Sequence, residues 1–356
     1  MKKSYLIISI ALVVFTACNS SKKETSKISG AGATFPAPFY NIVFKNYSQK
    51  SGNDVTYGGI GSGGGIRSLQ DKTVDFGATD VFLSDNEMNE MSAEVVHIPT
   101  ALGAVVMAYN LPGVDDLKLT ARLISDIYRG KITKWDDDAI KAVNPELNLP
   151  NKTITAVYRS DGSGTTYVFS DYMVKADELW KSEIGSGKAL NFPVGVAAKG
   201  NPGVAGIIAQ TEGSIGYIGS EYALALKIPS AALQNSSGSF IEANSKSISV
   251  AASIELPADT RIMITNSPVP EAYPISTFTW VILYREQSYN KRTEVNAKAL
   301  IGLMDYVISE EGQQIAEKTH YAPLPPAALE KTKAILETIT YNNIAISTQP
   351  VDTDER

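Results

Sequence analysis

Cysteine and histidine are almost absent from this chain. Its 356 residues include one cysteine, Cys18, and two histidines, His97 and His320. A single cysteine excludes a disulfide within the chain and a thiolate metal cluster, and two histidines exclude a metal site built from several imidazoles. We expect both histidines to be structural or surface residues. From this composition we expect the protein to bind no metal and no other cofactor.

The sequence also lacks runs of basic residues. Its formal net charge is −6, and loss of the N-terminal lysines Lys2 and Lys3 would take it from −6 to −8. An acidic chain without basic runs argues against nucleic acid as a partner. It does not argue against a small anionic ligand, because binding of such a ligand depends on the local field within a cleft.

No apolar run reaches the length of a membrane-spanning helix, which needs about 20 residues. Lys2 and Lys3 are followed by the apolar residues 5–15, interrupted only by Ser9, and then by two small residues before Cys18. This order is typical of a signal peptide, which we place at residues 1–17.

The residues around Cys18 resemble a bacterial lipobox, although Phe15 stands where leucine is usual. By that resemblance Cys18 becomes the diacylated N-terminus of an exported protein. The protein would then be anchored at the cell envelope, on the periplasmic side of a membrane or on the outer face of the cell membrane, and residues 18–26 would be a flexible tether. The alternative is an ordinary secretory signal peptide in which Cys18 is not modified.

Strand and helix patterns alternate along the rest of the chain, which predicts an α/β fold. The remaining length of roughly 330 residues suits two domains better than one. Residues 229–259 are polar and weakly patterned and are expected to form a surface excursion, and the tail from residue 348 is expected to be disordered. We predict strands over residues 54–57, 74–78, 97–110, 153–158, 214–218 and 278–284, and helices over 66–70, 119–128, 166–174, 203–210 and 297–308.

Three short segments rich in glycine and hydroxyl residues lie where a strand is expected to hand over to a helix. They are residues 30–35 (GAGATF), 59–65 (GIGSGGG) and 159–166 (RSDGSGTT). Glycine lets the backbone approach a ligand closely, each hydroxyl can donate a hydrogen bond, and a helix N-terminus adds unpaired N–H groups. Three such loops together with Arg159 indicate convergence on one small oxyanion.

Other interpretations of these loops are weaker. The second loop matches the dinucleotide fingerprint Gly-x-Gly-x-x-Gly, with Asp80 about 20 residues further on, but a nucleotide site would explain neither the other two loops nor Arg159. Ser163 lacks the preceding glycine of a nucleophile elbow, because Asp161 stands there. The sequence has no P-loop motif. Three ordinary tight turns remain the structural alternative.

The chain resembles the phosphate-binding proteins (PstS) of bacterial phosphate ABC importers. The matching segments appear in the family's order and run across nearly the whole mature chain. Two departures, Gly63 where a second serine is common and Tyr158 where a basic residue is often seen, fall outside the positions that the family uses for its ligand. The matching segments are residues 30–38 (GAGATFPAP), 57–62 (YGGIGS), 74–80 (VDFGATD), 126–137 (DIYRGKITKWDD), 161–165 (DGSGT) and 321–325 (YAPLP).

The resemblance implies a two-lobed periplasmic binding protein of the type II, Venus-flytrap kind, with mixed sheets flanked by helices and two crossovers at the hinge. It implies one lobe of residues 27–104 plus 276–356 and another of residues 105–275. It also implies a monomer that hands inorganic phosphate to permease subunits of an ABC importer. Carried over by motif position, the ligand contacts are Ala33, Thr34, Phe35, Ser62, Asp80, Arg159, Ser163, Gly164 and Thr165.

Two acidic residues have distinct expected roles. Asp161 is expected to orient Arg159 and temper its charge, unless it only forms a turn. The carboxylate of Asp80 is expected to face the bound anion and would repel it unless a proton lies between them. Phosphate carries such a proton, and sulfate does not. We therefore expect Asp80 to select phosphate, with a helix or turn cap as the alternative role.

Functions of other classes fit less well. A secreted phosphatase would need a metal cluster or an activated nucleophile, and neither is visible in the sequence, so we expect a binding protein and no enzyme. A protein for another tetrahedral oxyanion, or a phosphate-sensing lipoprotein that does not transport, remains the alternative.

Overall fold

The computed structural model describes residues 25–346. The signal peptide, Cys18, most of the tether and the tail from residue 348 lie outside the described residues. Among the residues described, no helix is both long and apolar enough to cross a membrane.

The strands of the described chain alternate with its helices. The strands are β1 (Lys27–Gly32), β2 (Asp54–Gly59), β3 (Phe76–Thr79), β4 (Val95–Tyr109), β5 (Lys118–Leu119), β6 (Thr155–Arg159), β7 (Val196–Ala198), β8 (Ser214–Gly219), β9 (Ala232–Gln234), β10 (Phe240–Ile241), β11 (Ser276–Tyr284), β12 (Thr340–Tyr341) and β13 (Ile344–Ala345). The helices are α1 (Ala37–Ser51), α2 (Ser62–Gln70), α3 (Asp85–Glu90), α4 (Ala121–Tyr128), α5 (Asp138–Val143), α6 (Gly164–Ala176), α7 (Glu178–Glu183), α8 (Gly200–Gln210), α9 (Ser220–Leu226), α10 (Ser245–Ala251), α11 (Glu294–Ile308), α12 (Glu310–Lys318) and α13 (Pro326–Glu337).

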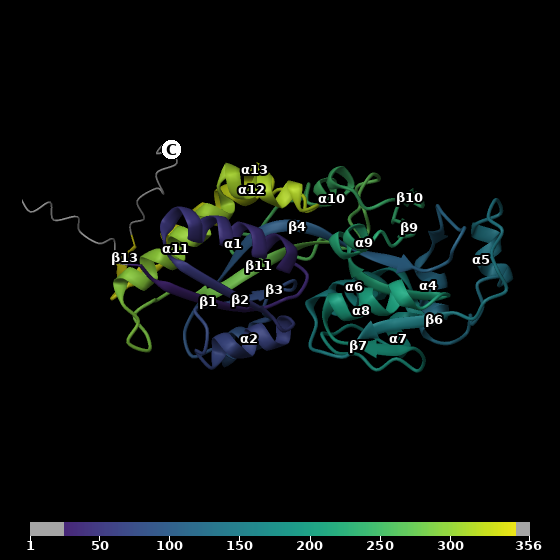
Figure 1. Cartoon of the computed structure of the whole chain (residues 1–356), viewed down its shortest axis with the longest axis horizontal. Helices are drawn as coiled ribbons and strands as arrows, with labels where there is room; N and C mark the ends of the chain where they lie inside the picture. Colours follow the sequence, from purple (N-terminus) through teal and green to yellow (C-terminus); the bar gives the residue numbers. More distant parts are fainter. Residues whose placement is uncertain (1–24, 347–356) are drawn as a thin grey trace, which may run out of the picture.

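The long strand β4 joins two lobes, which lie side by side in Figure 1. Its first part, up to Ala104, pairs antiparallel with β11 in the first lobe, and from Val105 onward it pairs antiparallel with β8 in the second lobe. All fifteen of its residues are buried. The resulting sheet has the strand order β2-β1-β3-β11-β4-β8-β6-β7. This arrangement confirms the predicted α/β fold with two lobes.

The return crossing is the segment that leads into β11. The N–H of Val105 donates to the carbonyl of Ile275 at 2.9 Å, and the hydroxyl of Tyr273 donates to the carbonyl of Val105 at 3.2 Å. The two connections between the lobes, β4 and the segment before β11, therefore contact each other at Val105, where β4 changes its pairing partner.

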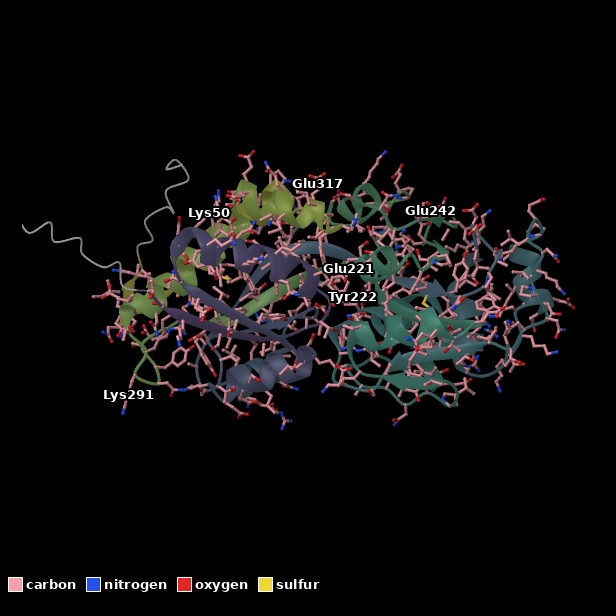
Figure 2. The ribbon with its side chains drawn as sticks, in the orientation of Figure 1. Lys50, Glu221, Tyr222, Glu242, Lys291 and Glu317 are labelled. Carbon is pink, nitrogen blue, oxygen red and sulfur yellow. The ribbon has the colours of Figure 1, made fainter. Side chains whose placement is uncertain are left out.

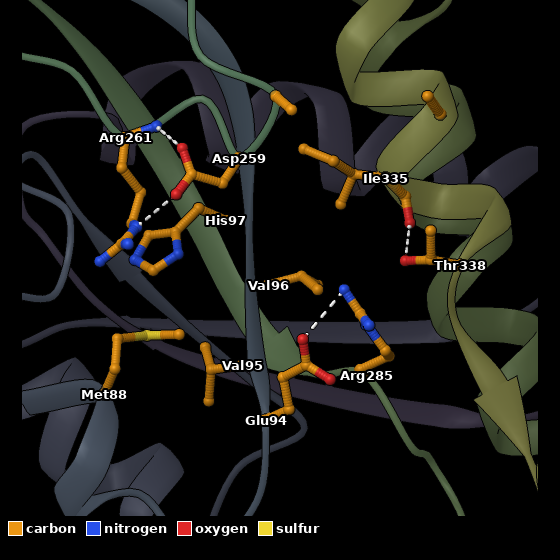
Figure 3. A pocket seen from close by; sticks show the side chains of 12 residues that line it. Met88, Glu94, Val95, Val96, His97, Asp259, Arg261, Arg285, Ile335 and Thr338 are labelled. Carbon is orange, nitrogen blue, oxygen red and sulfur yellow. Dashed lines mark hydrogen bonds and ion pairs between the residues drawn. The ribbon is translucent and has the colours of Figure 1, made fainter. Parts of the chain in front are cut away.

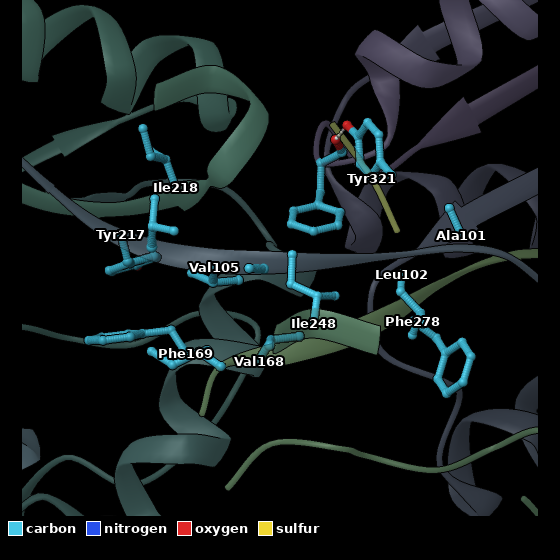
Figure 4. Packing of buried hydrophobic residues seen from close by; sticks show 14 of the residues in the cluster. Ala101, Leu102, Val105, Val168, Phe169, Tyr217, Ile218, Ile248, Phe278 and Tyr321 are labelled. Carbon is cyan, nitrogen blue, oxygen red and sulfur yellow. Dashed lines mark hydrogen bonds between the residues drawn. The ribbon is translucent and has the colours of Figure 1, made fainter. Parts of the chain in front are cut away.

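Helices cover both faces of the sheet in the first lobe. In the first lobe, α1, α11, α12 and α13 lie on one side and α2 on the other, as Figure 1 shows. The buried core is continuous between the lobes, and Figure 4 shows Val105 and Ile248 between the aromatic groups of the two halves. In the second lobe the rings of Phe169 and Tyr217 stack with centroids 4.3 Å apart, and in the first the rings of Phe35 and Tyr321 meet edge to face at 5.9 Å.

The predicted elements are present with small shifts at their ends, and two expectations were wrong. Helix α2 begins at Ser62 rather than at residue 66, so most of the second glycine segment is the first turn of a helix. Residues 229–259 are not only a surface excursion. They contain β9, β10 and α10, and Leu233 of β9 and Ile248 of α10 are buried in the core. Low helix propensity of glycine and short elements hid both features in the sequence.

Candidate functional site

The three glycine segments and Asp80 follow the carboxyl ends of strands. Strands β1, β2 and β3 run parallel in the first lobe, and Thr34, Ser62 and Asp80 follow them. Arg159 ends β6 in the second lobe, directly before the third glycine segment. The carboxyl edge of parallel strands is the usual place for a ligand in α/β sheets.

Glycine in the second segment lets α2 approach the strands closely. A Cβ on Gly65 would lie 2.5 Å from the Cα of Gly32 and 2.6 Å from the carbonyl oxygen of Ala31. Gly61, which precedes the helix, has a positive φ of 90° that disfavours other residues. This close packing places the buried hydroxyl of Ser62 next to Asp80, whose N–H donates to it at 3.4 Å.

Arg159 and Asp161 form a two-point ion pair. The Nε of Arg159 donates to Oδ1 of Asp161 at 2.8 Å, and its second Nη donates to Oδ2 at 2.5 Å. The side chain of Arg159 is 1% exposed. Burial would raise the pKa of Asp161, but the hydrogen bonds and charge of Arg159 outweigh it and lower that pKa below its usual value. Asp161 therefore remains ionised and fixes the plane of the guanidinium.

Helix α6 presents its N-terminus beside this ion pair. The Oγ of Ser163 caps the helix by accepting from the N–H of Thr166 at 3.0 Å, while the Ser163 N–H donates to the carbonyl of Lys188. Gly164 and Thr165 form the first turn, where N–H groups have no partner within the helix. The first turn of α6 therefore adds amide donors next to Arg159.

The residues of the two lobes meet directly. The N–H of Gly164 donates to Oγ of Ser62 at 3.1 Å, and the N–H of Gly63 donates to the carbonyl of Gly162 at 2.9 Å. The guanidinium of Arg159 donates to Oγ1 of Thr165 at 3.4 Å. Thr34, Ser62, Asp80, Arg159, Gly164 and Thr165 are thus brought together in one buried cluster.

Asp80 is 1% exposed. Unlike Asp161, it forms no ion pair with Arg159. The hydroxyl of Thr279 donates to its Oδ1 at 3.0 Å. Burial raises the pKa of Asp80 to about 7, and the hydrogen bond from Thr279 and the charge of Arg159 oppose that rise only in part. Its carboxyl group can therefore hold or release a proton near neutral pH.

Ala33 and Phe35 sit on either side of Thr34 but use their backbone differently. The N–H of Ala33 donates to the carbonyl of Ala78, and its carbonyl accepts from the hydroxyl of Tyr57. The carbonyl of Phe35 accepts from the hydroxyl of Tyr321 at 2.5 Å. These bonds fix the first loop, and the Phe35 side chain is fully buried in the core.

Two contributors to this cluster were not found from the sequence. Asn201, in the first turn of α8, contacts both Thr34 and Thr165. Tyr222 on α9 donates to the carbonyl of Thr34 at 2.6 Å. Figure 2 labels Tyr222 and Glu221 where the two lobes meet. Gly200, directly before Asn201, adopts a positive φ of 70°, but that turn is visible only in the structure.

A charged pair also links the two lobes. Lys188 in the second lobe forms an ion pair with Glu87 on α3 of the first lobe. Burial would raise the pKa of Glu87, but its bonds with Lys188 and Ser84 outweigh this and lower it. Lys188 thus holds Ser163 through its carbonyl and the opposite lobe through its side chain.

A separate cavity of about 460 Å³ lies between the start of β4, α13 and the segment around Asp259 (Figure 3). Two arginines and two acidic residues line it, so it carries no net positive charge to attract an anion. His97 on its wall is 2% exposed and accepts from the N–H of Leu83 through Nε2, and burial lowers its pKa to about 3. His97 is therefore a structural residue, as predicted. Within the described residues, no group of three or more His, Cys, Asp or Glu side chains could hold a metal ion.

Comparisons with known proteins identify the family. Residues 19–311 match the family model described as the PBP superfamily domain. The phosphate-binding protein PstS of Xylella fastidiosa is 39% identical over 321 residues, which cover 89% of this chain and 86% of that protein. The PstS protein of Haemophilus influenzae is 36% identical over 338 residues, covering 94% of this chain and 97% of that one.

Solved structures share the fold. A high-affinity periplasmic phosphate-binding protein bound with phosphate has a TM-score of 0.71 at 20% identity, covering 92% of this chain and 98% of its own. A phosphate ABC transporter substrate-binding protein of Clostridium perfringens with bound phosphate has a TM-score of 0.62 at 20% identity, covering 84% of this chain and all of its own. At these identities the likeness supports the fold alone.

Proposed function

The chain belongs to the PBP superfamily and, within it, to the PstS phosphate-binding proteins, and from this premise we propose that it captures inorganic phosphate between its lobes and delivers it to an ABC importer. The observation that carries the proposal is the buried cluster shared by the two lobes. It combines hydroxyl and amide donors, one guanidinium and one carboxylate, which suits an oxyanion that keeps a proton.

The charged residues and the backbone amides have distinct proposed parts in binding. Arg159 supplies the positive charge, held in plane by Asp161, and the amides of Phe35 and Thr165 supply backbone donors. The amide of Gly164 would join them by exchanging its bond to Ser62 for one to phosphate. Asp80 accepts the proton of the phosphate. The proposed ligand-binding set is Ala33, Thr34, Phe35, Ser62, Asp80, Arg159, Ser163, Gly164 and Thr165, with Asp161 in support.

We propose that the lobes comprise residues 27–104 plus 276–356 and residues 105–275. The change of partner along β4 at Val105 supports the first boundary, and the start of β11 at Ser276 supports the second. Because each lobe provides part of the cluster, a ligand bound to both should favour closure.

We also propose that the protein is exported as a monomer and held at the membrane by acyl chains on Cys18, near its permease partner. Two acyl signals suffice for stable anchoring where one is marginal. A Cys18→Ser variant should leave the membrane fraction while keeping phosphate binding. Equal membrane retention of both proteins would disprove the anchor.

The function is tested by equilibrium binding on ligand-stripped protein, with phosphate and sulfate measured side by side. We expect saturable binding of one phosphate, a higher melting temperature at millimolar phosphate, and no turnover of p-nitrophenyl phosphate. Absence of a thermal shift with phosphate would contradict the proposal. Preference for sulfate would indicate a binding protein for another oxyanion, and turnover of p-nitrophenyl phosphate would indicate a phosphatase. Phosphate binding by the protein, with phosphate uptake by cells unchanged after deletion of its gene, would indicate a sensor.

A further inference from the structure

Asn201 lies between the two lobes and bonds to a hydroxyl in each of them. It is fully buried in the first turn of α8. Its Nδ2 donates to Oγ1 of Thr34 at 3.0 Å in the first lobe and to Oγ1 of Thr165 at 3.0 Å in the second. Both hydrogens of the amide are thereby used, one on each lobe.

A backbone contact determines which way this amide points. The N–H of Gly219 donates to Oδ1 of Asn201 at 3.0 Å. A reversed amide would place its NH2 group against that N–H and its oxygen between the two threonines. Since Gly219 can only donate, the NH2 group must face Thr34 and Thr165.

The bonds at Thr34 leave its hydroxyl with one remaining capacity. A hydroxyl has two acceptor lone pairs and one hydrogen. Oγ1 of Thr34 accepts from Nδ2 of Asn201 and also from the backbone N–H of Asn201 at 3.1 Å. Both lone pairs are occupied, so the Thr34 hydroxyl can interact with a ligand only by donating its hydrogen.

The hydroxyl of Thr165 is occupied in the same way. Its Oγ1 accepts from Nδ2 of Asn201 and, at 3.4 Å, from the guanidinium of Arg159. Ser62 repeats the pattern with backbone donors alone, since its Oγ accepts from the N–H groups of Gly164 and Asp80. Three hydroxyls in the cluster are therefore saturated as acceptors.

We propose that Asn201 is a positioning residue that commits the hydroxyls of Thr34 and Thr165 to donate to the bound anion. It acts on the ligand only through these two hydroxyls, and by bonding to both it also links their positions when the lobes are closed. Without it each hydroxyl could rotate and present a lone pair to the anion, which is repulsive. The inference rests on the proposed function, because it assigns these two donors to phosphate.

The test is the variant Asn201→Asp, which keeps the shape but replaces the NH2 group by an oxygen that accepts. Thr34 and Thr165 would then donate to residue 201 instead of to phosphate. We expect phosphate affinity at pH 8 to fall by about 30-fold or more, and by more than in Asn201→Ala, where the hydroxyls stay free to turn to the ligand. The loss in Asn201→Asp, relative to wild type at each pH, should shrink toward pH 5, because a protonated carboxyl can again donate to one threonine.

A second background separates this effect from plain charge repulsion. In Thr34→Val there is no Thr34 hydroxyl to misdirect, so the loss caused by Asn201→Asp should be several-fold smaller there than in the wild-type background. An equal loss in both backgrounds, or a loss that equals that of Asn201→Ala at every pH, would overturn the proposal.

Folding and function are controlled separately. Melting temperatures without phosphate show whether each variant is folded. If Asn201→Asp does not fold, Asn201→Ala takes its place. The loss of phosphate affinity caused by Thr34→Val must then be smaller in the Asn201→Ala background than in wild type, and additive losses would overturn the proposal.

The proposed function can fail separately from this inference. If wild type does not bind phosphate, both fail. If wild type binds phosphate but the variants give the overturning results named above, this inference alone fails.

Discussion

Gly164 and Ser62, which belong to different lobes, approach each other too closely for a side chain to fit between them. The N–H of Gly164 donates to Oγ of Ser62 at 3.1 Å. A Cβ on Gly164 would lie 2.4 Å from that same oxygen and 2.8 Å from Oδ2 of Asp80. The closed arrangement of the cleft therefore depends on a glycine at this position.

We predict that Gly164→Ala weakens phosphate binding by about tenfold or more. Overpacking by one methyl group in a tight site costs about 1–3 kcal/mol, and about 1.4 kcal/mol corresponds to tenfold in affinity. The cost should appear in the dissociation constant, measured by calorimetry, and little in the melting temperature of the ligand-free protein, because the clash is between lobes.

Gly206 provides the matched control for this substitution. It lies in α8, and an added Cβ would meet nothing within 4 Å. Gly206→Ala should leave phosphate affinity unchanged and raise stability by up to about 1 kcal/mol through helix propensity. If Gly164→Ala binds phosphate as tightly as Gly206→Ala does, the lobes do not close as described.

The ion pair of Lys188 and Glu87 should stabilise closure modestly. Their side chains are 19% and 34% exposed, and pairs of this kind contribute up to about 1 kcal/mol. We predict that Lys188→Met and Glu87→Gln each weaken phosphate binding a few-fold at low salt, and that the double variant loses no more than the worse single one. Additive losses in this cycle would show that the two residues act independently.

The sequence predicted the fold well where its signals were local. The long apolar run at residues 97–110 became β4, and the alternation of strand and helix gave the α/β class. The start of α2 was missed because three successive glycines, Gly63 to Gly65, disfavour a helix, and only their packing against β1 explains them. Local propensity could not contain that tertiary reason.

The site was predictable to the extent that it lies in glycine segments. Thr34, Ser62 and Thr165 stand in such segments, and the structure brings them together. Asn201 and Lys188 were missed because nothing in the residues around them distinguishes a bond across the cleft from an ordinary surface position. Their contacts span 167 and 101 residues of chain, to Thr34 and Glu87, so only the fold reveals them.

We predict a pH dependence that originates in Glu221. This residue is 3% exposed where the lobes meet, and burial, with a smaller contribution from the charge of Asp80, holds its pKa well above its usual value. A carboxyl whose pKa is raised by folding stabilises the protein below its unfolded pKa, and this contribution is lost as pH rises through the folded pKa. The closed protein should therefore lose stability as pH rises above about 4.3, the usual pKa of a glutamate, by at most about 1.4 kcal/mol per pH unit from this group.

The measurement compares wild type with Glu221→Gln, both saturated with phosphate, by denaturant unfolding at several pH values. Because the ligand and its own titration are the same in both proteins, the difference between the two curves isolates Glu221. The variant should gain on wild type as pH rises. Parallel curves would mean that Glu221 does not change its protonation on unfolding.

The last prediction concerns the choice between phosphate and sulfate, and it isolates Asp80. Thr279 donates to Oδ1 of Asp80, which leaves Oδ2 beside Gly164 and facing the cleft. In Asp80→Asn the amide oxygen can keep the bond from Thr279 and turn its NH2 group to the cleft. That group can donate to an unprotonated oxygen, and the negative charge is gone, so the sulfate-to-phosphate affinity ratio should rise by at least about tenfold, or about 1.4 kcal/mol.

The pKa of Asp80, raised by burial to about 7, adds a pH test with a defined sign. Below that value the protonated carboxyl can donate to sulfate, and above it the carboxylate repels sulfate, so the sulfate affinity of wild type should fall as pH rises from 5.5 to 8.5. Asp80→Asn should show no such fall. Thr279→Val, which keeps the charge of Asp80, is the control and should retain the preference for phosphate. Competition calorimetry with both anions at fixed ionic strength decides the question, because an unchanged ratio in Asp80→Asn would make Asp80 a structural residue and move the source of selectivity to the donors around Arg159.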